Sequence, residues 1–312
     1  MFELSNKKIL VTGGAGFVGK KVVESLIASG AEAENITIPR SQDCDLRILD
    51  NCFKSAENQS LIIHLAAHVG GIGLNREKPA ELFYDNLIMG TQLIHAANQL
   101  GVEKFVCIGT ICAYPKFTPV PFLEDNLWDG YPEETNAPYG IAKKALLVQL
   151  QSYRQQYGFN GIYLLPVNLY GPGDNFNPQS SHVIPALIDK IYRAQKNGDK
   201  QIAVWGDGSP TREFIYVDDV AQGIVLASQS YNSPEPVNLG TNSEISIKEL
   251  VNLICQAMDF QGEIIWQIEQ PNGQPRRCLD TQRAKDAFGF VAQTTLLEGI
   301  SKTVNWYRKS LG

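Results

Sequence analysis

The sequence predicts an α/β protein with a doubly wound parallel sheet and a smaller C-terminal α/β domain. Apolar, β-branched runs such as KILVT at 8–12 alternate with helical-period segments along the first half of the chain. Such alternation implies parallel strands joined by helical crossovers. The second half opens on a stretch rich in Gly, Pro and Asn and continues with shorter strands. We therefore expect residues 1–170 to form the first domain, with returning segments near 213–240, and residues 171–312 to form mainly the second.

Each element follows from its periodicity and from the residue that stops it. Gly30, Gly101 and Gly158 follow the first three expected helices as stop signals. The expected helices are 19–29, 79–100, 138–157, 247–258 and 295–310. The expected strands are 8–12, 36–38, 61–66, 105–109, 163–168, 202–205, 214–217 and 264–268.

Composition excludes several classes of protein. The chain has 312 residues, 44% of them hydrophobic, which is ample for a large core. Its net charge of -6 argues against nucleic acid as the main partner, because phosphate neutralisation needs clustered Lys and Arg. The six cysteines form no C-x-x-C pair, so we expect neither a disulfide framework nor a metal site. We find no signal peptide and no apolar run of about 18 residues, and we expect a cytoplasmic protein without a membrane partner.

A glycine-rich loop directly follows the first expected strand and opens the first expected helix. Such glycines let the backbone turn tightly and approach a pyrophosphate bound at the helix N-terminus, as in Rossmann-type domains. The alternative is that the glycines only allow close packing of helix and strand. The loop has the pattern G-x-x-G-x-x-G and comprises Gly13, Gly14, Ala15, Gly16, Phe17, Val18 and Gly19.

The end of the second strand bears on the choice between the two nicotinamide cofactors. An acid there would bind the ribose 2′-hydroxyl, but the sequence is TIPRS at 37–41, with Arg40 and no acid. A guanidinium can pair a 2′-phosphate bidentately, so we favour NADP(H) over NAD. The alternative is that Arg40 is a solvated loop residue. Asp45 could bind the adenine amino group or, equally, cap a helix.

A Y-x-x-x-K pair stands near the start of the helix at 138–157. The spacing puts Tyr139 and Lys143 on one helix face. We expect the lysine to lower the phenol pKa and to hold the nicotinamide ribose, so that Tyr139 can exchange a proton with a carbonyl or alcohol oxygen. Thr110, at the end of the preceding strand, supplies a hydroxyl to the same oxygen.

These residues together resemble the extended, nucleotide-sugar-modifying branch of the short-chain dehydrogenase/reductase superfamily. Two further marks of that branch are HLAA at 64–67 and REFIYVDDV at 212–220. The resemblance implies a Rossmann fold, a nucleotide diphosphate sugar as substrate and hydride chemistry at a sugar carbon. It also implies cofactor contacts at Leu65, Ala66, Ala67, Ile108, Gly109, Lys143, Pro166, Asn168, Leu169 and His182.

Two segments resemble the GDP-L-fucose synthase family in particular. GTICAYPK at 109–116 has that family's G-[hydroxyl residue]-x-C-x-Y-P-K pattern, and NLYGP at 168–172 leads into DNFNP and SHVIPAL. The resemblance implies that Cys112 and His182 are the acid–base pair that epimerises the two carbons beside the ketone of GDP-4-keto-6-deoxy-D-mannose. A thiol and an imidazole suit this task, since both titrate near the working pH. NADPH then reduces C4 to give GDP-L-fucose.

The chain departs from this family at two points. Thr110 stands where the family carries Ser, which keeps the hydroxyl, and the phosphate loop lacks an Arg that some members use for the 2′-phosphate. Arg40 is then left to contact that phosphate. Without the motif, Cys112 would be taken as core packing and His182 as a helix cap.

The resemblance further implies substrate contacts at Lys190, Trp205, Arg212 and Asp280. Lys190 and Arg212 could neutralise the diphosphate. Trp205 could line the nucleotide pocket or plug the gap between domains. Asp280 could bind a hydroxyl or amide, or cap the helix that follows it.

The sequence leaves two alternative functions open. The first rival is a plain 4-reductase or 4-epimerase of another nucleotide sugar, including a GDP-heptose relative, with Cys112 silent. The second is a non-catalytic NADP(H)-binding protein, which the intact set of Thr110, Tyr139 and Lys143 disfavours.

The helices at 79–100 and 138–157 carry more apolar surface than one sheet face needs, so we expect a two-fold dimer through four helices.

Overall fold

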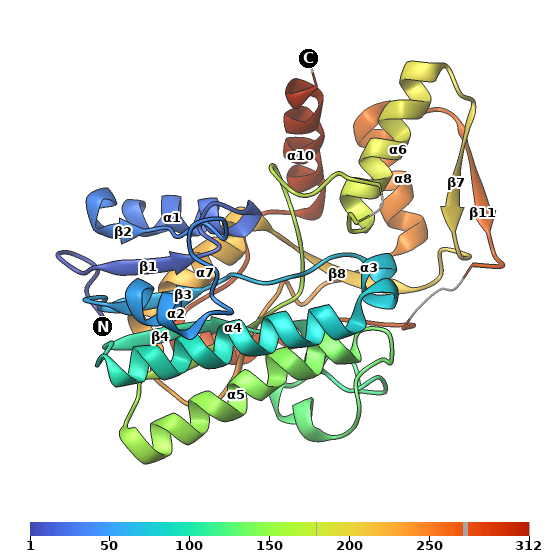
Figure 1. The fold of residues 1–312 in the computed structure, drawn as a ribbon. Coiled ribbons are helices and arrows are strands. Elements are labelled where there is room, and N and C mark those ends of the chain that lie inside the picture. The colour runs from blue at the N-terminus through green and yellow to red at the C-terminus, as the bar shows by residue number, and fades with distance from the viewer. Residues whose placement is uncertain (179, 271–273, 312) are drawn as a thin grey trace.

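A six-stranded, all-parallel sheet forms the centre of the N-terminal part (Figure 1). The computed structural model describes residues 1–178, 180–270 and 274–311, and every predicted site residue lies within these ranges. The predicted fold class is confirmed. In spatial order, the strands are β2 (Ile36–Thr37), β1 (Ile9–Thr12), β3 (Leu61–His64), β4 (Lys104–Ile108), β5 (Gly161–Pro166) and β9 (Val237–Leu239).

The strand order reverses between β1 and β3. The chain runs outward from β1 to β2, returns to place β3 on the other side of β1, and then continues to β4 and β5. Strands β1 and β3 are buried along their whole length. In open α/β sheets, ligands bind beyond the carboxyl ends of the strands at such a reversal. The topology thus indicates where a cofactor would bind.

Helices cover both faces of this sheet. Figure 1 shows α1 and α7 on one side and α4 and α5 on the other, and α2 packs against α4. A Cβ atom at Gly90 would lie 2.3 Å from Leu146 Cδ1, so glycine lets α4 approach α5 closely without displacing the Leu146 side chain. None of the described helices is long and apolar enough to cross a membrane. The bounds are α1 (Phe17–Ala28), α2 (Leu49–Ala56), α4 (Pro79–Gln99), α5 (Ala137–Tyr157) and α7 (Val217–Ser230).

A second apolar core lies among the C-terminal elements, apart from the core around the parallel sheet. Two small sheets contribute to it: one has the order β10-β8-β6, and the other pairs β11 with β7. Its helices are α6 (Val183–Asn197), α8 (Ile247–Met258) and α10 (Leu296–Ser310). Its strands are β6 (Asn168–Tyr170), β7 (Gln201–Trp205), β8 (Thr211–Tyr216), β10 (Glu244–Ser246) and β11 (Glu263–Gln267).

The strand predicted at 163–168 is found, but as two strands with different partners rather than one. Strand β5 ends at Pro166, and β6 begins at Asn168 and pairs with β8 in a different sheet. Between them, the Val167 N–H still donates to Leu239 O of β9 at 3.0 Å. The chain therefore crosses from one sheet to the other within two residues. The short elements that complete the fold are α3 (Ile72–Glu77), α9 (Gln282–Phe288), η1 (Ala33–Asn35), η2 (Ile111–Ala113) and η3 (Glu124–Trp128).

Candidate active site

The glycine-rich loop packs tightly on its neighbouring backbone at the N-terminus of α1. Gly13 has a φ of +72°, and a Cβ atom there would lie 2.9 Å from the backbone nitrogen of Ala66. A Cβ atom at Gly19 would lie 2.1 Å from Gly13 O. The first turn of α1 carries no acidic residue. A glycine-rich loop at a helix N-terminus without an acidic residue fits the pyrophosphate of a dinucleotide.

Thr12 and His64 tie the ends of β1 and β3 together. Thr12 Oγ1 and His64 Nδ1 are hydrogen-bonded at 2.8 Å, and the Ala66 N–H donates to the same hydroxyl at 3.3 Å. Burial, and secondarily the charge of Lys143, lowers the pKa of His64 to about 3. The imidazole is therefore neutral at physiological pH. This contact fixes Leu65 and Ala66 beside the phosphate loop, where they were expected to meet the cofactor.

Arg40 lies at the same edge of the sheet. It is exposed just beyond β2. A Cβ atom at Gly14 of the loop would meet Ile38 Cγ2 at 2.9 Å, so the end of β2 and the phosphate loop are neighbours. This placement is consistent with a contact between Arg40 and a ribose 2′-phosphate.

Asp45 is engaged within its own loop. Its two carboxylate oxygens accept from Arg47 Nε at 3.0 and 3.1 Å and from Arg47 Nη2 at 2.8 Å, and these bonds lower its pKa. Arg47 Nη1 also donates to Asp85 Oδ1 on α4 at 3.3 Å. Asp45 thus anchors a bridge from the loop to α4, and its contact with an adenine remains a prediction.

The turn η2 presents a hydroxyl and a thiol at the carboxyl end of β4. Thr110 is the N-cap of η2, and its Oγ1 accepts a hydrogen bond from the Cys112 N–H at 3.2 Å. The Gly109 N–H donates to Leu164 O at 2.7 Å, which ties the start of the turn to β5. Cys112 is half-buried, unlike Cys107, which is fully buried within β4. Cys112 packs against the apolar core yet keeps part of its surface exposed, and its catalytic role remains a prediction.

The first turn of α5 packs directly on η2. A Cβ atom at Gly140 would lie 2.3 Å from Cys112 O, so only glycine allows this approach. The neighbouring Tyr139 phenol is hydrogen-bonded to Thr110. Lys143, one turn further along α5, is 2% exposed, and burial lowers its pKa. The hydroxyl, the thiol and the Y-x-x-x-K pair therefore form one cluster, although they come from two separate segments.

The expected lowering of the Tyr139 pKa by Lys143 is not found. Burial raises this pKa above its ordinary value, the sulfurs of Cys112 and Cys107 raise it further, and the Thr110 hydrogen bond offsets part of the effect. Tyr139 thus holds its proton at neutral pH. A neutral phenol is the form needed to donate a proton to an oxygen that gains negative charge.

His182, Lys190 and Trp205 all come from the C-terminal part, on α6 and β7. His182 occupies the N-cap position of α6 without a side-chain capping bond, so the capping alternative is not realised. Partial dehydration lowers the pKa of its ring. Lys190 of α6 donates through Nζ to Ala203 O of β7, and Trp205 on that strand is 58% exposed. Trp205 is therefore too exposed to fill a gap between the two domains. Among the described residues, no recorded contact joins His182 to Cys112.

Arg212, from the other half of the chain, interacts electrostatically with the thiol. Burial, followed by repulsion from Arg277, lowers the pKa of Arg212 to about 10, and Cys112 opposes this effect. The guanidinium also donates to Thr211 O at 2.7 Å. Asp280 Oδ1 accepts from the Gln282 N–H at 2.9 Å, but the N-cap of the following helix is Thr281, so Asp280 is not the N-cap considered as its alternative.

Two residues of this region were given no role from the sequence, although Glu213 lies within the REFIYVDDV segment at 212–220. Arg277 Nη1 donates to Cys112 Sγ at 3.8 Å across a sequence separation of 165. Glu213 is completely buried, and its carboxylate accepts the backbone N–H groups of Leu279, Thr241 and Asn242. These bonds fix the segment that carries Arg277 and Asp280. Only contacts between distant segments show these roles.

Comparison with known proteins shows the family to which the chain belongs. The model of the NAD dependent epimerase/dehydratase family matches residues 9–240. The chain belongs to this family. GDP-L-fucose synthase 1 of Arabidopsis thaliana is 39% identical over 97% of this chain and 94% of its own length. The predicted resemblance to GDP-L-fucose synthases is confirmed.

Solved structures show the same fold over nearly the whole chain. A GDP-L-fucose synthetase from Naegleria fowleri, bound to NADP, has a TM-score of 0.89 at 28% identity and covers 98% of this chain and 95% of its own. A GDP-6-OMe-4-keto-L-xylo-heptose reductase from C. jejuni has a TM-score of 0.91 at 26% identity, with 99% of both chains covered. The neighbours thus include a GDP-L-fucose synthetase and a GDP-heptose reductase.

Proposed function

We propose that this enzyme converts GDP-4-keto-6-deoxy-D-mannose to GDP-L-fucose, first by 3,5-epimerisation and then by NADPH-dependent reduction of the 4-keto group. The observation that carries the proposal is the cluster of Thr110, Cys112 and Tyr139, in which a thiol stands beside two hydroxyls suited to one carbonyl oxygen. Its relatives named GDP-L-fucose synthase support the choice of sugar.

The epimerisation needs groups on both faces of the sugar ring. Protons on the carbons beside a ketone are acidic when the enolate oxygen is stabilised, and hydrogen bonds from Tyr139 and Thr110 would provide that stabilisation. Of Cys112 and His182, one would remove a proton and the other would return one from the opposite face. The lowered pKa of His182 keeps much of its imidazole neutral, so that it can accept a proton near neutral pH.

The reduction would use the same carbonyl. When NADPH is bound, it supplies the hydride to C4. The phenol of Tyr139, which holds its proton at neutral pH, would then protonate the oxygen. The backbone of the loop at 13–19 and the guanidinium of Arg40 would hold the pyrophosphate and the 2′-phosphate. Lys143 would hold the nicotinamide ribose.

The two parts of the chain would bind different ligands. We assign NADP(H) mainly to residues 1–170 with returning segments near 213–240, and the nucleotide sugar mainly to residues 171–312. Lys190 and Arg212 would face the diphosphate, and exposed Trp205 would stack on the nucleotide. Asp280 would bind a polar group of the substrate with the carboxylate oxygen that does not accept from Gln282.

We also propose a two-fold dimer through α4 and α5 in the cytoplasm. Exposed apolar side chains on these two helices support the dimer; they are Phe83, Tyr84, Val148 and Tyr157. All six cysteines are free, which suits a reducing compartment. Light scattering at micromolar concentration should give twice the chain mass, and a monomer would end the dimer proposal.

Deuterium incorporation tests the proposed reaction. The protein is incubated with GDP-4-keto-6-deoxy-D-mannose and NADPH in deuterium oxide, and the product is examined by mass spectrometry and NMR. The proposal requires GDP-L-fucose with deuterium at C3 and C5. A reduced sugar without ring deuterium would show a plain 4-reductase. Binding of NADPH without turnover would show a non-catalytic protein.

The structural neighbour named as a GDP-heptose reductase favours a second candidate function, the reduction of a GDP-4-keto-heptose. The C. jejuni reductase covers the whole fold at a TM-score of 0.91, so a GDP-4-keto-heptose could present the same ketone to Tyr139. The same assay with both sugars at equal concentration decides between them. A larger kcat/KM for the 6-deoxy sugar supports the main proposal.

A further inference from the structure

We propose that Glu213 is a positioning residue for the nucleotide sugar: its buried carboxylate joins the end of β9 to the segment at 277–280 and thereby holds Arg212 in place to bind the diphosphate. The inference rests on the proposed role of Arg212 at the diphosphate. It goes beyond that role, because it gives a residue without exposed surface control over the affinity for the GDP moiety.

The first observation is how the Glu213 carboxylate is bonded. Oε2 accepts the Leu279 N–H at 2.6 Å. Oε1 accepts the Asn242 N–H at 2.8 Å, the Thr241 hydroxyl at 3.2 Å and the Thr241 N–H. A carboxylate that is 0% exposed is tolerated only when donors satisfy it in this way. The two oxygens therefore hold two different segments of the chain.

The second observation is that these segments come from both halves of the fold. Thr241 and Asn242 follow β9, the last strand of the parallel sheet, whereas Glu213 itself lies on β8 in the small sheet β10-β8-β6. The main chain of Glu213 adds two further bonds. Its carbonyl accepts from Asn168 Nδ2 of β6 at 2.8 Å, and its N–H donates to Arg277 O at 3.1 Å. Glu213 thus joins the parallel sheet to the C-terminal elements at one buried point.

The third observation is that two guanidinium groups stand on the segments that Glu213 fixes. Arg212 precedes it on β8, and the Arg277 backbone is bonded to it directly. After burial, repulsion from Arg277 is the larger cause that lowers the pKa of Arg212. Among the described residues, the recorded hydrogen-bond partners of the two guanidinium groups include no carboxylate. Two cations held close together in this way favour an anion beside them, and a rigid backbone is needed to keep them there.

A purely structural role of Glu213 makes a different prediction. Loss of such a role would lower the thermal stability and the amount of folded enzyme, but the folded molecules would bind GDP as before. A positioning role changes the affinity for GDP itself. The affinity for NADPH serves as the internal reference, because the side-chain bonds of Glu213 reach only Thr241, Asn242 and Leu279, none of which is expected to contact the cofactor.

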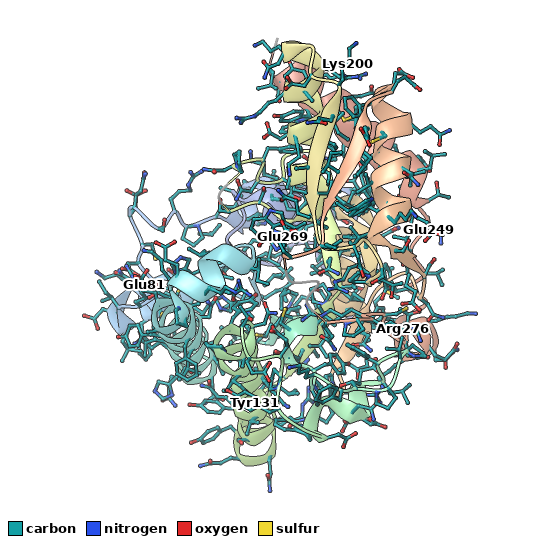
Figure 2. All side chains as sticks on the ribbon, turned by 90° about the vertical axis from the view of Figure 1, so that its right-hand side faces the viewer. Glu81, Tyr131, Lys200, Glu249, Glu269 and Arg276 are labelled. Atoms are coloured by element: carbon teal, nitrogen blue, oxygen red, sulfur yellow. The ribbon has the colours of Figure 1, made fainter. Side chains whose placement is uncertain are left out.

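The residue directly opposite Glu213 offers a matched control. Glu244 of β10 faces Glu213 in the antiparallel ladder. Its carboxylate accepts from Thr211 Oγ1 and from the guanidinium of Arg276, which projects at the edge of the molecule (Figure 2). Glu244→Gln therefore removes the same charge from the neighbouring strand without removing a bond to the end of β9 or to the segment at 277–280.

Two variants disturb the Glu213 carboxylate in different ways. In Glu213→Gln, an amide NH₂ replaces one oxygen and meets an N–H group that needs an acceptor. In Gly240→Ala, the new Cβ would lie 2.4 Å from Glu213 Oε1, so the carboxylate must move although its charge remains. Agreement between the two variants separates the position of the carboxylate from its charge.

The experiment titrates the full-length protein with GDP by calorimetry and with NADPH by fluorescence, and then measures KM and kcat with the 4-keto sugar. We expect Glu213→Gln to raise the Kd for GDP by about tenfold or more, which is the usual contribution of one hydrogen bond to a charged group, and to raise KM in proportion. Gly240→Ala should act in the same direction. The Kd for NADPH and kcat should change little, and Glu244→Gln should leave all four values unchanged. Thermal unfolding confirms that each variant is folded.

A double-variant cycle tests whether Glu213 acts through Arg212. In the Arg212→Gln background, Glu213→Gln should raise the Kd for GDP by a much smaller factor than in the wild type, because the group that it positions is already absent. An equal factor in both backgrounds would overturn the proposed link to Arg212.

The remaining outcomes separate this inference from the proposed function. An unchanged Kd for GDP in Glu213→Gln and Gly240→Ala, even with lower thermal stability, overturns the positioning role, and so does an equal loss in Glu244→Gln. If GDP affinity responds as expected but the wild type neither epimerises nor reduces the 4-keto sugar, the proposed function fails and the role of Glu213 stands. A wild type that binds no GDP would overturn both.

Discussion

Replacing Gly140 by alanine should separate the two halves of the catalytic cluster without removing any functional group. The new Cβ would lie 2.3 Å from Cys112 O, whereas real Cβ contacts essentially never fall below 3.0 Å. The first turn of α5 must therefore move by about 0.7 Å or more from η2. Catalytic geometry tolerates about 0.5 Å, and a displacement of about 1 Å can cost about 100-fold in rate. We expect kcat for ketone reduction to fall by about 10- to 100-fold.

The assay follows NADPH oxidation at 340 nm with the 4-keto sugar as substrate, beside thermal unfolding and NADPH titration by fluorescence. Overpacking should cost about 1–3 kcal/mol of unfolding free energy, while NADPH affinity should change little. Gly130→Ala is the control, because its Cβ would meet Pro115 at an ordinary 3.4 Å. A Gly140→Ala enzyme with wild-type kcat would show that contact between α5 and η2 does not position Tyr139.

Three further predictions address single groups. Tyr139→Phe should lower kcat for reduction by about 10²- to 10⁴-fold, the usual contribution of a general acid, and should leave the Kd for NADPH nearly unchanged in a fluorescence titration. Arg40→Gln should raise the Kd for NADPH by about tenfold or more but not that for NADH; equal effects on both would remove the 2′-phosphate contact. Because burial lowers the folded-state pKa of His64 to about 3, its contribution to stability is complete above the unfolded-state value of about 6.5 and falls with pH below it. The unfolding free energy of the wild type, measured with urea, should therefore fall between pH 6.5 and pH 5. In His64→Gln the slope of this fall should be smaller by about 1.4 kcal/mol per pH unit.

Features carried by neighbouring residues could be predicted from the sequence. The phosphate loop and the pair of Tyr139 and Lys143 each depend on a turn or a helix repeat within a few residues, and the structure places them as expected. Strand–helix alternation likewise gave the parallel sheet. The pairing of Asp45 with Arg47 is also local, and the spacing of two residues was a signal that could have been used.

Features that depend on distant segments could not be predicted in this way. The contact of Arg277 with Cys112 joins residues 165 positions apart. The sequence alone does not tell which of the adjacent Arg276 and Arg277 faces the thiol, because that depends on the path of the backbone. The break at Val167 looks in sequence like the interior of one strand, because β5 and β6 are nearly continuous and differ only in their partners. The Tyr139 pKa moves opposite to the expected direction because burial raises it and no lysine contribution offsets that effect.

The most direct test of the central claim compares Cys112→Ala with the wild type in deuterium oxide. Both enzymes receive GDP-4-keto-6-deoxy-D-mannose, first without NADPH to follow ring exchange and then with NADPH to follow reduction. The account predicts exchange at C3 and C5 for the wild type alone, and reduction of the unepimerised ketone by Cys112→Ala. Ring deuterium at the wild-type rate in Cys112→Ala would show that the thiol of η2 takes no part in epimerisation.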